Sequence, residues 1–156
     1  MASTMQDTLS ELGRIVQSYQ AANDDTDRET ARILRVNRTD LRCLELLLDS
    51  GGVTPRSLGD RLGLTTGSVT AMLDRLERLG FLTRNPHPDD GRKLVVTITS
   101  QGAERCYALF APLVDEGSRV MAEQFTVDEL QLAIRFLRTL TDVQNRHVSR
   151  LADHGR

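Results

Sequence analysis

The residues best suited to bind an anion lie close together between Pro86 and Thr99, in the segment PHPDDGRKLVVTIT. Arg92 and Lys93, the only lysine of the chain, follow an Asp-Gly dipeptide at positions 90 and 91. Asp-Gly is a strong hairpin signal because glycine tolerates a positive φ, and the prolines before it limit pairing at a strand edge. The pattern predicts a protruding hairpin with cations at its tip, where Asp90 can orient the guanidinium of Arg92.

Patterns typical of catalytic or metal-binding sites do not occur in the chain. There is no phosphate-binding glycine loop and no nucleophile elbow, and His87, His147 and His154 do not have the spacing of metal ligands. Cys43 and Cys106 each fall within a helical apolar pattern, so neither a disulfide framework nor a cysteine-rich zinc site is expected. We therefore expect no catalytic residue, no metal and no cofactor, and the chain is not expected to be an enzyme.

Length, charge and hydropathy exclude further classes of protein. The 156 residues suffice for one domain, or for one small core extended by helices. A formal charge of -2 and a pI near 5.9 argue against a polycation that coats nucleic acid or acidic membranes, so any anion-binding surface must be local. No apolar run is long enough to span a membrane and no secretory signal is evident, so a cytoplasmic protein is expected.

Two short helices joined by a tight turn precede the hairpin. Thr54 and Pro55 are favourable at the start of a helix over 55–62, and Gly63 suits the left-handed position that ends it. Thr65 or Thr66 can cap the next helix, which runs to about position 79. One face of this second helix is apolar, whereas the opposite face is slim and carries Gly67, Ala71, Asp74 and Arg78, with Ser68, Thr70 and Arg75 beside it. A groove can receive such a helix.

Amphipathic helices flank this region on both sides. The first is predicted from position 5, with an interruption at Asn23-Asp24-Asp25 and a short helix over about 27–36. Further helices are predicted over about 39–48, from about 100 onwards, and after a capping box formed by Thr126 and Glu129. The last helix is apolar over more than half its circumference, which favours a homodimer over the alternative of a monomeric bundle. The fold class is mainly α with a small β-hairpin.

A helix-turn-helix followed directly by a basic hairpin is a compact way to recognise double-stranded DNA. The second helix fits the major groove, which is about 12 Å wide, while the hairpin tip can reach the neighbouring minor groove. A planar cation such as Arg92 suits the negative potential of a narrow minor groove.

The segment LTTGSVTAMLDRLERLGFLTRNPHPDDGRKLVVTITSQG resembles the recognition helix and wing of the multiple-antibiotic-resistance regulator (MarR) family. The matching features are Asp74-Arg75-Leu76, Leu79-Gly80, Arg84, Asp90-x-Arg92 and Thr99-x-x-Gly102, and the match extends over roughly 39–102. The resemblance implies a dimeric winged-helix transcription regulator, usually a repressor, that binds a pseudopalindromic operator. It predicts residues 37–99 as the winged helix-turn-helix DNA-binding region, and residues 1–36 and 100–156 as the helical dimerisation region.

The resemblance also implies roles for individual residues. Arg92 is implied as the minor-groove arginine of the wing, with Arg84, Asp90 and Lys93 beside it. The expected recognition-helix contacts are Thr65, Thr66, Gly67, Ser68, Thr70 and Arg75. The family often carries a longer polar or basic residue at the position of Ala71, and a polar one at Gly67. We therefore expect specificity from hydroxyl and thymine-methyl contacts and DNA shape, with Arg56, Arg78 and Lys93 contacting phosphates.

Three further hypotheses concern regulation and the loss of DNA binding. Family members often respond to phenolic or other aromatic ligands that lie between the dimer helices and the winged helix. Arg14, Tyr19 or His147 can line a crevice at that place. A thiol-based redox sensor is the second hypothesis, although burial of Cys43 would suppress its reactivity. The third is a protein-interaction module without DNA binding, because residues 38–99 carry nine Lys+Arg and eight Asp+Glu, a net charge of only +1.

Overall fold

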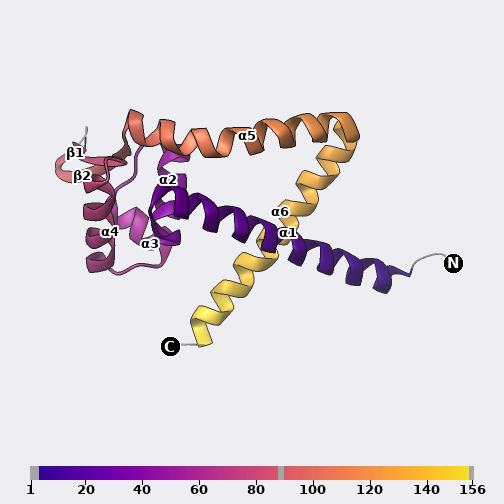
Figure 1. Ribbon diagram of the computed structural model, residues 1–156. Coiled ribbons are helices and arrows are strands. Elements are labelled where there is room, and N and C mark those ends of the chain that lie inside the picture. Colours follow the sequence, from indigo (N-terminus) through magenta and orange to yellow (C-terminus); the bar gives the residue numbers. More distant parts are fainter. Residues whose placement is uncertain (1–3, 88–89, 155–156) are drawn as a thin grey trace. The chain divides into compact units, whose positions relative to one another are not determined.

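The computed structural model describes residues 4–87 and 90–154, in which the chain forms helices and one antiparallel hairpin (Figure 1). The predicted fold class is confirmed. In chain order the elements are α1 (Met5–Leu34), α2 (Arg38–Ser50), α3 (Pro55–Leu62), α4 (Thr66–Arg78), β1 (Leu82–His87), β2 (Asp90–Ile98), α5 (Ser100–Gln124) and α6 (Val127–His154). Two compact units divide within α5, between Phe110 and Ala111.

The core of the first unit lies between α2, α3, α4 and the hairpin, and the end of α1 and the start of α5 add Ala31, Leu34 and Cys106 to it. On α4 the predicted apolar face is buried from Val69 to Leu76, because its side chains recur every three or four residues and so point the same way. Leu79, also predicted on this face, is exposed at the end of the helix. Each such side chain contributes roughly 1.5–3 kcal/mol to folding. The largest fully buried apolar side chains are Phe81, Leu41, Leu44, Leu47, Leu58, Leu73, Leu76, Leu82 and Val96.

The hairpin is anchored to the core at its base. β1 pairs with β2 from Leu82 opposite Ile98 to Pro86 opposite Leu94, and the register shifts between Pro86 and His87. Val53, which precedes α3, exchanges two backbone hydrogen bonds with Val96 of β2, at 3.0 and 2.8 Å. This bridge ties the wing to the helix-turn-helix, whereas Leu94 remains exposed nearer the tip.

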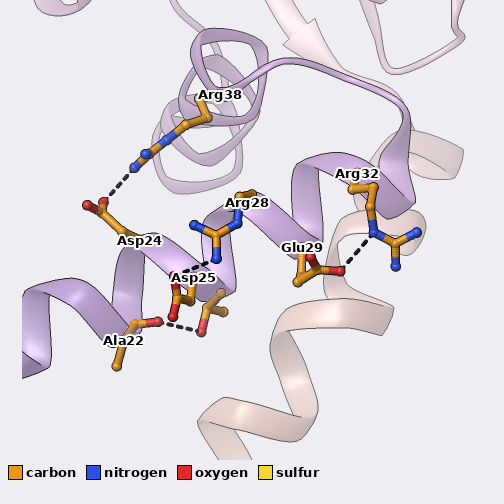
Figure 2. Close-up of polar contacts among 8 residues, drawn as sticks. Ala22, Asp24, Asp25, Arg28, Glu29, Arg32 and Arg38 are labelled. Atoms are coloured by element: carbon orange, nitrogen blue, oxygen red, sulfur yellow. Dashed lines mark hydrogen bonds and ion pairs between the residues drawn. The ribbon is translucent and has the colours of Figure 1, made fainter.

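The predicted break in the first helix is wrong, because α1 continues through positions 23–25. Thr26 does not cap a new helix, since its hydroxyl donates to the carbonyl of Ala22 at 3.1 Å (Figure 2). Within a helix, Asn and Asp each lower the helix stability by less than about 1 kcal/mol relative to Ala. The hydrogen bonds of the surrounding helical turns outweigh this loss. The ion pairs at this segment are Asp25 with Arg28 at 2.6 Å, Glu29 with Arg32 at 2.8 Å, and Asp24 with Arg38 of α2 at 2.5 Å.

The second unit consists of the end of α5 and α6. Thr126 and Glu129 form the predicted capping box, in which Thr126 N donates to the Glu129 carboxylate at 2.8 Å and Glu129 N donates to Thr126 Oγ1 at 3.3 Å. All of α6 belongs to the described residues, and none of its side chains is buried. Its exposed large apolar residues are Val127, Leu132, Ile134, Leu137, Val143, Val148 and Leu151. In the part of the chain that the structure describes, we find no helix with the length and apolar character needed to cross a membrane.

Candidate nucleic-acid interface

The turn between α3 and α4 is built by local capping and by one close approach. Gly63 ends α3 in the left-handed region at φ 65°, where a side chain would be strained. Leu64 then donates its N–H to Gly59 O at 2.9 Å. A Cβ on Gly59 would lie only 3.2 Å from Leu64 O and from Val69 Cγ2, so the absence of a side chain at position 59 lets the two helices pack closely. This packing fixes the angle between α3 and α4.

The first two turns of α4 present exposed small and hydroxyl-bearing residues. Thr65 Oγ1 accepts from Ser68 N at 3.3 Å and lies 2.9 Å from Ser68 Oγ, while Thr70 Oγ1 donates to Thr66 O at 3.0 Å. These hydroxyls are thereby oriented, and each keeps lone pairs that can accept from a base edge. A Cβ on Gly67 would meet nothing within 4 Å. Over these two turns the slim face predicted for this helix is therefore exposed, and no described residue crowds it at position 67.

A surface depression of about 420 Å³ lies between α3 and α4. Its polar lining includes Arg56 and Asp60 of α3, with Thr66 and Thr70 of α4. The predicted phosphate contact Arg56 is thus close to the start of the recognition helix. Asp60 was not predicted as a site residue, although it is four residues from Arg56 and hence on the same helix face. A carboxylate at this position repels a phosphate group, but it can accept a hydrogen bond from the amino group of cytosine.

Arg75, predicted to contact DNA, is held by Asp40 of α2. Its Nε donates to Asp40 Oδ2 at 2.9 Å and its Nη2 donates to Oδ1 at 2.5 Å. The Asp40 side chain is fully buried and also accepts from Asn37 N at 3.2 Å, whereas the Arg75 side chain is 41% exposed. The hydrogen bonds with Asp40 raise the pKa of Arg75 above its ordinary value. No sequence pattern predicts this pair, because Asp40 and Arg75 lie 35 positions apart.

Arg84, predicted as a wing contact, is also paired within the chain. Its Nη2 lies 2.7 Å from Asp74 Oδ1 and also contacts Glu77, and its Nε donates to Glu77 Oε2 at 3.2 Å. The hydrogen bonds with Glu77 are the main cause of a raised pKa at Arg84, and those with Arg84 lower the pKa of Glu77. Because Asp74 and Glu77 belong to α4, these contacts join the wing to the second half of the recognition helix. Arg78 is exposed and donates to the carbonyl oxygen of Asp74 at 3.3 Å.

The outer part of the wing is described only in part. Lys93 Nζ lies 3.2 Å from Asp90 Oδ2 in an exposed ion pair. Arg92 belongs to β2, but its side chain and residues 88–89 lie outside the described part of the structure. The proposed minor-groove contact of Arg92 therefore stays a prediction.

The residues expected to take part in regulation belong to different units or are buried. Cys43 and Cys106 are both buried free thiols, and burial raises the pKa of both, that of Cys43 to about 12. A thiol with so high a pKa is mostly protonated and reacts slowly, which argues against redox sensing. Within residues 4–87 and 90–154 no cluster of His, Cys, Asp and Glu suits a metal ion. Tyr19 lies exposed on α1 and His147 on α6, in different units.

Comparisons with known proteins agree with this geometry. The family model described as the MarR family matches residues 36–94. The HTH-type transcriptional regulator YcgE of Bacillus subtilis is 34% identical over 121 residues, which cover 78% of either chain. The multiple antibiotic resistance protein MarR of Salmonella typhimurium is 28% identical over 119 residues, covering 76% of this chain and 83% of that protein.

Two solved structures extend the likeness over most of the chain. A cysteine-to-serine mutant of MarR from E. coli, complexed with operator DNA, has a TM-score of 0.56 at 25% identity and covers 88% of this chain and 99% of that one. A MarR family protein from Bacillus stearothermophilus has a TM-score of 0.69 at 20% identity and covers 92% of this chain and 99% of that one. The second likeness concerns the fold alone.

Proposed function

The chain belongs to the MarR family of winged-helix, DNA-binding transcription regulators, and we propose that it acts as a homodimeric repressor at a pseudopalindromic operator. The family consists of regulators and not enzymes. The observation that carries the proposal is the exposed, slim first half of α4, with oriented hydroxyls at Thr65, Ser68 and Thr70. Because it would act on chromosomal DNA, we propose that the protein resides in the cytoplasm.

In the proposed complex, α4 enters the major groove and the wing reaches the adjacent minor groove. Thr65, Thr66, Ser68 and Thr70 contact bases or phosphates at the start of α4, where Gly67 allows close approach. Arg56, Arg78 and Lys93 contact phosphates, and Arg92 occupies the minor groove. Arg75 and Arg84 already hold carboxylates, so we assign them the orientation of α4 and of the wing.

The proposal of a second copy rests on uncovered apolar surface. None of the α6 residues is buried, and Leu9, Ile15 and Tyr19 of α1 are exposed as well. Apolar surface of this extent is unusual on a monomer. The simplest partner that can bury it is a second copy of the chain, which carries the same surface. The dimer would place two α4 helices at the two half-sites of one operator.

The test is a selection of bound sites from random duplex DNA, followed by binding measurements over a range of salt concentrations. We expect two inverted half-sites about one helical turn apart and an affinity that falls steeply with salt. The alternative, a protein-interaction module, predicts no enrichment of any site and no binding at low salt.

Regulation by a small aromatic ligand is inferred from the family resemblance alone. Adding a panel of phenolic and other aromatic acids to the protein–operator complex tests it, with release measured by fluorescence anisotropy. Unchanged anisotropy with every compound of the panel would refute regulation by this class of ligand.

A further inference from the structure

We propose that Thr99, Gly102 and Arg105 position the recognition helix by fixing the first turns of α5 against the turn that follows α4. We call these three residues the α5 junction. The inference rests on the proposed function, because it concerns how α4 is oriented toward an operator. Thr99 and Gly102 belong to the motif that resembles the MarR family, and no motif includes Arg105.

Thr99 joins the start of α5 to the turn that follows α4. Its backbone N donates to Phe81 O at 2.9 Å, and its hydroxyl donates to Gly80 O at 2.7 Å. The same hydroxyl oxygen accepts from Gly102 N at 2.9 Å, which caps α5. One side chain therefore satisfies an amide of α5 and a carbonyl of the turn after α4, so neither element can shift without breaking a hydrogen bond.

Gly102 brings the backbone of α5 into direct contact with the same turn. A Cβ at this position would lie 2.3 Å from Phe81 O, 2.8 Å from Phe81 Cα and 2.9 Å from Phe81 C. All three atoms belong to the backbone, so no side-chain rotation can relieve the overlap. Any residue other than glycine must push the first turn of α5 away from Phe81.

Arg105 closes the contact one turn further along α5. Its Nη1 donates to Leu79 O at 3.2 Å, and its guanidinium carbon lies 3.9 Å from the centroid of the Phe81 ring. Leu79 is the C-cap of α4, where the helix dipole favours a cation. Phe81 is fully buried and donates its N–H to Leu76 O at 3.0 Å. The residue whose ring contacts Arg105 is therefore itself hydrogen-bonded to α4.

The junction lies in the first unit, while α5 continues into the second. In the proposed dimer, α5 links the DNA-binding region of each copy to the interface between the copies. The angle at the junction then sets the distance between the two α4 helices, and so the half-site spacing that the dimer accepts. A merely structural junction would affect stability without affecting this choice.

The experiment compares wild-type protein with Gly102→Ala, and uses Gly117→Ala as the matched control. Gly117 lies on the same helix, and a Cβ there meets nothing within 4 Å. Each protein is titrated with the half-sites recovered by selection, placed at the preferred separation and at separations one and two base pairs shorter or longer. A duplex with a single half-site, thermal melting and sedimentation are measured in parallel.

We expect Gly102→Ala to bind about tenfold more weakly at the wild-type spacing while its affinity for a single half-site changes little. Its preferred spacing should shift or broaden, and Gly117→Ala should behave as wild type. Arg105→Met removes the hydrogen bond to Leu79 O and the cation over the Phe81 ring without a steric clash, so it tests the junction even if Gly102→Ala does not fold.

An unaltered ranking of spacings in Gly102→Ala and Arg105→Met, whatever their melting temperatures, would overturn the positioning role. Wild-type protein that binds none of the duplexes would instead refute the proposed DNA-binding function, and the inference would fall with it.

Discussion

The ion pair between Asp40 and Arg75 can be broken from either side, and the two sides are not equivalent. Replacing Arg75 with Gln leaves a fully buried carboxylate that still accepts a hydrogen bond from Asn37 N. Loss of one partner from a buried pair typically costs 3–5 kcal/mol, and the 41% exposure of Arg75 reduces this to about 2–4 kcal/mol. Replacing Asp40 with Asn leaves a partly hydrated guanidinium and keeps an acceptor, so we expect about 1–2 kcal/mol.

Urea denaturation followed by circular dichroism measures these differences in the free energy of unfolding. Arg75→Gln should destabilise the protein more than Asp40→Asn. The free energy of unfolding of the double variant should fall by less than the sum of the two single losses. Equal stability of Arg75→Gln and wild type, or a larger loss in Asp40→Asn, would refute the reasoning from burial.

Salt dependence of operator binding separates positioning by Arg75 from direct contact. A lost phosphate contact lowers the slope of log K against log salt by about 0.9, hence about 1.8 for two copies. If Arg75 positions α4, both Arg75→Gln and Asp40→Asn weaken binding with an unchanged slope. The control is Arg56→Gln, which should lower the slope without affecting stability, since Arg56 is exposed. A lower slope for Arg75→Gln but not for Asp40→Asn would identify Arg75 as a DNA contact.

Three further predictions concern the wing, the dimer and the thiols. Arg92→Ala should weaken operator binding about tenfold, measured by anisotropy, without changing sedimentation or melting. Leu137→Glu should raise the dimer dissociation constant at least about a hundredfold in sedimentation equilibrium, because it places a charge on the uncovered face of α6. At pH 8 the Cys43 thiol stays protonated in the native state because burial raises its pKa to about 12, so the native protein should react far more slowly with a thiol reagent than the urea-unfolded protein does. Because the pKa of Cys43 is raised on folding, its contribution to stability is present below about pH 8.5 and is lost as the pH rises toward 12. Rapid labelling of native Cys43, or operator release by peroxide, would contradict the predicted low reactivity of the buried thiol.

The sequence alone predicted the elements whose signals are local. The bounds of α3 agree with the prediction over 55–62, because a capping threonine, a proline at the first position and a terminal glycine act within a few residues of themselves. The hairpin and the capping box of α6 were predicted for the same reason. The break predicted within α1 failed because turn-forming residues lower helix stability only slightly, and they do not end a helix whose hydrogen bonds continue.

The tertiary structure decided which charged groups meet. Arg75 and Asp40 are 35 positions apart, and no periodicity links them. The same holds for Arg105 and Leu79, and for the backbone contact that only Gly102 allows. Helix and turn formation depend on hydrogen bonds between residues a few positions apart, so residue types and spacing suffice to predict them. Pairing between distant side chains depends on how the helices pack against one another, and only the folded chain fixes that arrangement.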